Sequence, residues 1–169
     1  MKQQEQTKPI TFEDARILFR NFEGREEKFN PPGRRSFCVL LDPKSADVLA
    51  ADGWNVRWLE PREEGDARQP YLQVSVSYKA RPPKIVMISE TSKNKTFLTE
   101  DTVHIIDWAD IKTVDFIVTP YHWDVNGKTG IKAYLKKMFI TLEEDELELK
   151  YADTSEHSYE GEFDDEELD

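Results

Sequence analysis

Basic and aromatic side chains occur together in three stretches of this chain. The first, Arg20 to Phe37, reads RNFEGREEKFNPPGRRSF and holds five Arg or Lys, three Phe and three acids. Residues 71–96 hold five Arg or Lys against the single acid Glu90, and residues 126–138 hold four Lys and no acid. Cationic side chains bind phosphates, and flat rings stack on unpaired bases. The pattern therefore favours a surface for single-stranded nucleic acid over one for a duplex, whose paired bases offer no open face to a ring.

Two sets of candidate binding residues follow from these stretches. The predicted phosphate contacts are Arg20, Arg25, Lys28, Arg34, Arg35, Lys79, Arg81, Lys84, Lys132 and Lys136. The predicted stacking rings are Phe22, Phe29, Tyr71, Trp123 and Tyr134. Taken singly, each of them also fits a plainer role, as a solvated Lys or Arg or as a core aromatic. The binding hypothesis depends on three such stretches occurring in one small domain.

Period-two alternation supports a shared face within two of the stretches. Successive side chains of a strand point to opposite faces of its sheet. Lys132, Tyr134 and Lys136 therefore fall on one face of a strand. Tyr71 and Lys79 fall together on the polar face of another, opposite an apolar row.

The net charge of −11 is concentrated at the C-terminal end. Residues 151–169 hold nine Asp or Glu and no Lys or Arg, which leaves 25 acids against 23 bases in residues 1–150. Such a run buries too little apolar surface to fold, so we expect a disordered acidic tail. One interpretation is a solubilising tail. The other is a polyanion that competes with nucleic acid and recruits basic partner proteins, through Phe163, Asp164, Asp165, Glu166, Glu167, Leu168 and Asp169.

The sequence contains few catalytic patterns. The three histidines, His104, His122 and His157, lack the spacing of a metal site. GKTG at 127–130 lacks the upstream glycine of a phosphate-binding loop. A magnesium-dependent nuclease remains an alternative, with ligands drawn from Asp107, Asp110, Asp115 and Asp124. We expect no metal, no cofactor and no enzymatic activity.

Length and composition favour one globular domain. We expect residues 1–9 to be disordered, residues 10–151 to form the domain and residues 152–169 to form the tail. Cys38 is the only cysteine and lies in the apolar run FCVLL, which favours a reducing compartment. The sequence has no apolar run long enough for a membrane span and no secretory leader. We therefore expect a cytoplasmic protein.

Most of the secondary structure expected from the sequence is β-strand. The expected strands are 14–22, 35–42, 54–59, 71–79, 84–89, 114–123 and 129–142, with a helix at 43–52 and a short terminal helix at 143–151. We expect the segment 25–33 to be a hairpin loop, 92–95 to be a polar loop, and Trp54, Trp58 and Trp108 to be core residues. Asn126-Gly127 predicts a tight hairpin turn. These elements predict a mainly β fold, a small, partly open antiparallel β-barrel with one helix between early strands.

Four blocks of this chain resemble the phage-encoded single-stranded DNA-binding proteins. They are ILFRNFEGREEKFNPPGRRSFCVLLD, ADGWNVRWL, YLQVSVSYKARPP and GIKAYLKKMFITLEEDELELKYA, together spanning about residues 12 to 152. The resemblance implies an OB-type barrel with an acidic tail. It also implies a protein that coats and protects single-stranded DNA in replication, recombination and repair, and recruits partners through the tail. The alternative from the residues alone is a β-domain interaction module whose tail mimics DNA.

Overall fold

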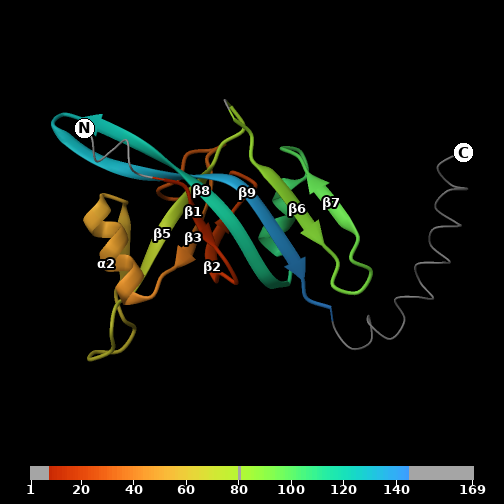
Figure 1. The fold of residues 1–169 in the computed structure, drawn as a ribbon, viewed down its shortest axis with the longest axis horizontal. Coiled ribbons are helices and arrows are strands. Elements are labelled where there is room, and N and C mark those ends of the chain that lie inside the picture. The colour runs from red at the N-terminus through yellow and green to blue at the C-terminus, as the bar shows by residue number, and fades with distance from the viewer. Residues whose placement is uncertain (1–7, 80, 145–169) are drawn as a thin grey trace, which may run out of the picture.

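The computed structural model describes residues 8–79 and 81–144. The fold is mainly β, as predicted, and its strands form one open sheet (Figure 1). Within these residues, no helix has both the length and the apolar character needed to cross a membrane. The expected terminal helix, the acidic tail and its residues Phe163, Asp164, Asp165, Glu166, Glu167, Leu168 and Asp169 lie outside the described residues, apart from Glu143 and Glu144.

Nine strands and two helical segments follow one another in the described part of the chain. They are β1 (Ile10–Phe12), β2 (Ile17–Asn21), β3 (Arg35–Leu40), α2 (Pro43–Asp52), β4 (Val56–Leu59), β5 (Gln69–Val76), β6 (Lys84–Ile88), β7 (Lys95–Leu98), the 3₁₀ helix η1 (Val103–Trp108), β8 (Ile111–Val125) and β9 (Lys128–Leu142). Along the main path of the sheet the order is β1-β8-β9-β5-β3-β2. β4 pairs with β5, and the β6–β7 hairpin pairs with β9 through β6.

The helix α2 forms where the sequence predicts it. The Asp42 side chain caps its first turn by accepting a hydrogen bond from the Ser45 N–H at 3.0 Å. Pro43 occupies the first turn, where a missing N–H does no harm. Gly53 ends the helix in the left-handed region, at φ 105°.

The β8–β9 hairpin is the longest element of the fold. Asn126 and Gly127 both have positive φ and join Val125 to Lys128, so the predicted turn is confirmed. β9 also pairs in parallel with β5 at Ala133 and Tyr134, and with β6 from Lys137 to Thr141. The other strand pairs are antiparallel, as predicted, and the two parallel pairings on β9 are the exception.

The strands differ from the prediction in two other places. Of the strand expected at 14–22, only Ile17–Asn21 forms β2, and its pairing with β3 shifts register between Leu18 and Asn21. Phe19 lies at this irregularity with φ 53°. The polar loop predicted at 92–95 is present up to Asn94, but the strand β7 that follows it was not predicted, because Lys95 to Phe97 are exposed and so lack the alternation that marks a strand.

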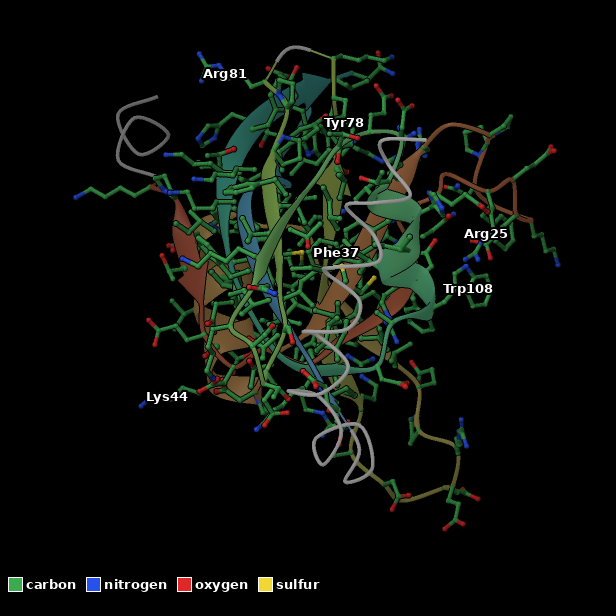
Figure 2. All side chains as sticks on the ribbon, turned by 90° about the vertical axis from the view of Figure 1, so that its right-hand side faces the viewer. Arg25, Phe37, Lys44, Tyr78, Arg81 and Trp108 are labelled. Carbon is green, nitrogen blue, oxygen red and sulfur yellow. The ribbon has the colours of Figure 1, made fainter. Side chains whose placement is uncertain are left out.

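The core is a cluster of apolar side chains enclosed by the sheet. The rings of Phe22 and Phe37 stack at a centroid distance of 5.2 Å, and Phe37 meets Phe116 edge-on at 5.2 Å. Trp54 is buried as predicted, but Trp108 is 73% exposed at the end of η1. Figure 2 shows Phe37 inside the molecule and Trp108 beside Arg25 at its surface. The expected core role of Trp108 was wrong, because η1 directs its buried side chains, Val103 and Ile106, inward instead.

Candidate nucleic-acid interface

One buried amide holds the basic loop between β2 and β3 in place. Asn21 is 3% exposed, and its Oδ1 accepts hydrogen bonds from the N–H groups of Gly24 and Arg25 at 3.0 and 2.9 Å. Its Nδ2 donates to the carbonyl of Arg25 and to the carboxylate of Glu27. These bonds satisfy the amide on both sides and fix the start of the loop.

The tip of this loop is a tight turn. The backbones of Glu27 and Asn30 exchange two hydrogen bonds, at 2.9 and 3.0 Å, which leaves Lys28 and Phe29 at the tip. The Asn30 side chain donates to the carbonyls of Arg25 and Arg34 and so ties both sides of the loop together. Phe29 is 88% exposed, with the Lys28 ammonium 5.3 Å from its ring centroid. An exposed ring and a cation are therefore presented on an ordered support.

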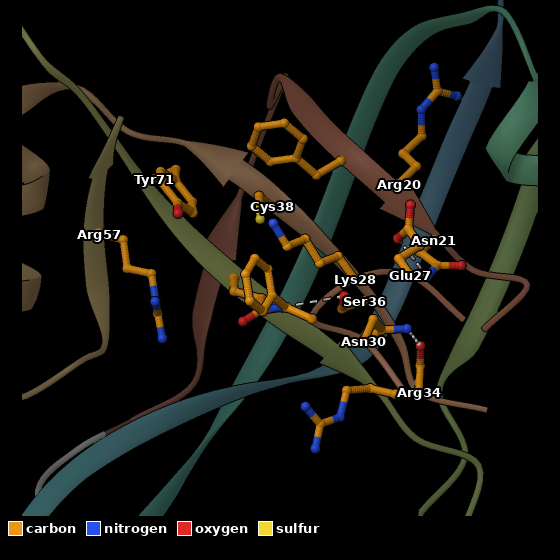
Figure 3. A pocket seen from close by; sticks show the side chains of 13 residues that line it. Arg20, Asn21, Glu27, Lys28, Asn30, Arg34, Ser36, Cys38, Arg57 and Tyr71 are labelled. Carbon is orange, nitrogen blue, oxygen red and sulfur yellow. Dashed lines mark hydrogen bonds between the residues drawn. The ribbon is translucent and has the colours of Figure 1, made fainter. Parts of the chain in front are cut away.

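Beside this loop lies a groove of about 690 Å³, called here the first groove. Figure 3 shows Arg57 and Tyr71 on one side of it and Arg20 and Asn21 on the other. Its lining is Phe19, Arg20, Asn21, Glu27, Lys28, Phe29, Asn30, Arg34, Ser36, Cys38, Arg57, Tyr71 and Gln73. Four Arg or Lys against one Glu give this groove a cationic character.

Cys38 lies in the first groove as a buried thiol. Burial raises its pKa to about 12, although nearby Arg57 acts in the opposite direction. The thiol is therefore neutral at physiological pH and adds no negative charge to the groove.

A second groove, of about 710 Å³, adjoins the first at Arg34, which lines both. The second groove is lined by Pro32, Gly33, Arg34, Arg35, Ser75, Val76, Ser77, Tyr78, Lys79, Glu100, Lys132 and Tyr134. Strand register explains the continuity. Ser36 of β3 pairs with Ser75 of β5, and Ser75 pairs with Tyr134 of β9. One outward-facing row of side chains therefore links the two grooves.

Aromatic rings line both grooves. Phe19 and Tyr71 meet edge-on in the first groove, with centroids 6.2 Å apart. Tyr134 in the second groove meets Tyr121 edge-on at 5.8 Å, and the Lys132 ammonium lies 5.2 Å from the Tyr134 centroid. Rings with a cation alongside are the elements that a stacked, unpaired base and its phosphate require.

The structure brings together nine of the fifteen predicted site residues. Arg20, Lys28, Phe29, Arg34, Arg35, Tyr71, Lys79, Lys132 and Tyr134 line one groove or both. Arg25, Arg81, Lys84, Trp123 and Lys136 lie on the surface of the molecule but line neither groove. Phe22 is fully buried in the core, so its predicted role as a stacking ring was wrong. Phe22 is the first residue after β2, where the chain turns its side chain toward Phe37.

Two of the groove arginines also serve the fold. The Arg20 guanidinium donates to the carbonyls of Ile106 and Ala109, at 2.7 and 2.9 Å, and so holds η1 against β2. Arg35 pairs with Glu100 at 3.3 Å and lies 5.4 Å from the Tyr78 ring centroid. Arg35 is therefore paired with a carboxylate. The other cations of the grooves have no carboxylate partner among the described residues; they are Arg20, Lys28, Arg34, Arg57, Lys79 and Lys132.

Trp123 has a packing role in the β8–β9 hairpin. Its ring covers Gly130 on the neighbouring strand so closely that a Cβ atom there would lie 2.5 Å from Cζ2. The ring therefore acts as a cross-strand staple.

Several residues of the grooves were not among the predicted binding residues. Gln73 and Ser75 alternate with buried residues of β5, so their outward direction was readable, but short polar side chains carry no binding pattern of their own. Arg57 was readable in the same way, as the residue opposite the face of Trp54 and Trp58. Phe19 had no such signal, because an irregularity in β2 and a positive φ turn it outward.

The aspartates considered as metal ligands do not form a site. Asp107 accepts hydrogen bonds from the N–H groups of Phe22 and Glu23, and Asp115 accepts one from Asp14 N–H. Across residues 8–79 and 81–144, no three His, Cys, Asp or Glu side chains are grouped to hold a metal ion. These two carboxylates therefore serve as backbone caps.

Known proteins share this fold. The single-stranded DNA-binding protein from bacteriophage Enc34, in a C-terminally truncated form, is 8% identical, with a TM-score of 0.50 over 81% of this chain and 87% of that one. The Enc34 protein in complex with single-stranded DNA is 6% identical, with a TM-score of 0.50 over 81% of this chain and 88% of that one. A comparison with proteins of curated function finds no match.

Family membership is shown by the sequence itself. Residues 1–167 match the profile of the family described as "Putative phage ssDNA-binding domain". The match spans nearly the whole chain, and it agrees with the open, mainly β fold. This chain therefore belongs to the phage single-stranded DNA-binding domain family.

Proposed function

We propose that this protein binds single-stranded DNA, without strong sequence preference, along the path formed by the two grooves. The observation that carries the proposal is the junction at Arg34, where two cationic grooves that are both lined by aromatic rings meet. Family membership supports the same ligand, as does the shared fold of a protein solved with single-stranded DNA.

The proposed contacts divide into phosphate and base contacts. Lys28, Arg34 and Arg57 hold phosphates in the first groove, and Lys79 and Lys132 hold them in the second. Phe29, Tyr71 and Tyr134 stack on bases, each for about 1–3 kcal/mol. Because every base has a flat face, stacking and charge together tolerate any sequence.

In the cell, this binding would coat and protect single strands during replication, recombination or repair, with no chemical step. The acidic C-terminal residues would compete with DNA for the grooves and recruit basic partner proteins. The sequence supports this regulation through the concentration of nine acids in residues 151–169.

A charge reversal at the junction of the grooves tests the proposal. The anisotropy of a labelled oligo-dT reports binding by the wild-type protein, by Arg34→Glu and by Lys44→Glu. Lys44 is an exposed residue on α2, outside both grooves, and its reversal changes the net charge equally. We expect Arg34→Glu to bind about tenfold or more weakly and Lys44→Glu to bind nearly as the wild type does.

Two results would overturn the proposal. One is equal affinity of the wild-type protein for oligo-dT and for a duplex of the same length, since the exposed rings would then contribute nothing. The other is an equal effect of the two charge reversals, since binding would then follow net charge and not the grooves.

A further inference from the structure

The outer face of the sheet carries a second cationic and aromatic surface around β6, β7 and β9. Strand register places Phe97 of β7 beside Val86 of β6, and Val86 beside Phe139 of β9. The same register places Lys84 of β6 beside Lys137 of β9. Side chains paired across neighbouring strands point to the same face of a sheet. These five residues form what we call the β6–β7 surface, and none of them lines either groove.

The β6–β7 surface faces solvent and not the core. Ile85 and Met138 belong to the core cluster, so the residues that alternate with them point outward. Phe97 is 61% exposed. Val86 is 1% exposed although it lies outside the core cluster, so its neighbours on the outer face shield it from water. The row of apolar side chains is therefore packed at its centre and open at Phe97.

The charges of this surface are left uncompensated by the described residues. Lys84 and Lys137 stand directly opposite each other, and like charges in that position destabilise a sheet. Neither makes a salt bridge with a described carboxylate. Asp115, which pairs with Phe139, accepts a hydrogen bond from the N–H of Asp14 and forms no salt bridge with either lysine. An anionic ligand would relieve the repulsion between the two lysines.

Another exposed ring provides a contrast. Trp108 is 73% exposed, and the Arg25 guanidinium lies 5.4 Å from its ring centroid. However, Arg25 is 3.9 Å from a Glu23 oxygen, and Trp108 follows Asp107 and precedes Asp110 in the chain. The acids around Trp108 disfavour phosphate, whereas the lysines of the β6–β7 surface favour it.

The path from the second groove to this surface is short. Tyr134 in the second groove and Lys137 in the β6–β7 surface are three residues apart on β9. At about 3.3 Å per residue, their Cα atoms are roughly 10 Å apart, which an unpaired strand spans in about two nucleotides. A strand that leaves the second groove along β9 therefore reaches Lys137 and Lys84 directly.

We propose that the β6–β7 surface is a further contact site for single-stranded DNA, used by strands longer than the two grooves hold. Lys84 and Lys137 bind a phosphate, and the open face of Phe97 stacks on a base, with Lys84 Nζ 5.4 Å from the ring centroid. This inference rests on the proposed function of the grooves and extends the path of the DNA beyond them.

Oligonucleotides of two lengths separate the surface from the grooves. Anisotropy would be measured with oligo-dT of about 6 and about 20 nucleotides, chosen around the site sizes of about 4–16 nucleotides per OB fold. Phe97→Ala and Lys84→Glu are compared with Trp108→Ala and Lys44→Glu, which change an exposed ring and an exposed lysine elsewhere. We expect the first pair to lose about tenfold in affinity for the long oligonucleotide and less than twofold for the short one. The control pair should bind both lengths as the wild type does.

The outcomes keep the two proposals apart. If the wild-type protein binds neither length, the proposed function itself fails. If it binds both, and the first pair binds the long oligonucleotide as tightly as the wild type does, only the present inference fails, and the surface is left for a protein partner. Equal losses on both lengths also overturn it, because the variants then disturb the grooves. Lys84→Glu leaves the ring over Val86 in place, so the test does not depend on Phe97→Ala folding normally.

Discussion

Single residues of this protein show how burial changes the chemistry of a side chain. Asn21 looks like an ordinary loop residue in the sequence, yet it is buried and organises the basic loop through both ends of its amide. Phe22, its neighbour, was predicted to meet DNA and is instead stacked in the core. Residue type alone therefore does not show whether a side chain contacts DNA or stabilises the loop and core behind the binding surface.

Cys38 provides a prediction about pH. Burial raises the pKa of its thiol from 9.0 to about 12, so between these values the unfolded chain loses a proton that the folded chain keeps. The free energy of unfolding should therefore be unaffected by this group below pH 9 and fall as the pH rises above it. Urea unfolding at pH 8 and pH 10 should show a loss about 1 kcal/mol larger in the wild-type protein than in Cys38→Ala. An equal loss of unfolding free energy in both proteins would show that burial does not raise the pKa of the Cys38 thiol.

Elements of the fold determine which residues can meet. β9 is long enough to pair with β8 along its length and with β5 and then β6 on the other side. β9 places Tyr134 beside Ser75 of β5, which in turn pairs with Ser36 of β3, although Tyr134 and Ser36 are far apart in the sequence. The interface therefore depends on the β8–β9 hairpin keeping its register.

The hairpin offers a prediction at this scale. Gly130→Ala would place a Cβ atom 2.5 Å from Cζ2 of Trp123 and should reduce the free energy of unfolding by about 1–3 kcal/mol. Gly130 does not have a positive φ, so the backbone itself accepts alanine. In a Trp123→Ala background the same substitution should therefore have little effect. Urea unfolding of the wild-type protein, the two single variants and the double variant measures the interaction energy between residues 123 and 130. An equal loss in both backgrounds would mean that the ring does not cause it.

The whole molecule separates its charges. Residues 1–150 are close to neutral, with 25 acids and 23 bases, yet cations without partners among the described residues gather in the grooves. The nine acids of residues 151–169 account for most of the net charge. An acidic protein can in this way offer DNA a positive surface.

The acidic C-terminal residues should change how DNA binding depends on salt. A chain ending at Tyr151 should bind oligo-dT several-fold more tightly than the full chain at about 50 mM salt, because the competing acids are gone. The difference should shrink toward about 300 mM salt, where both competition and DNA binding are screened. A full-length chain with these acids replaced by Asn and Gln is the matched control and should behave like the shortened chain. Unchanged affinity in both would contradict the competition.

Part of this protein was determined by its sequence alone. Alternation in residues 71–79, the Asp42 cap with Gly53, and the Asn126-Gly127 turn each specify their element, because each depends on neighbours within a few residues. The resemblance in four blocks likewise led to the family that the sequence profile shows. Only the tertiary structure decided that Phe22 is core, that Phe19 and Phe97 are exposed, and that Arg34 joins two grooves. The physical reason is that these outcomes depend on strand register, irregular pairing and parallel contacts between distant segments, which no local pattern contains.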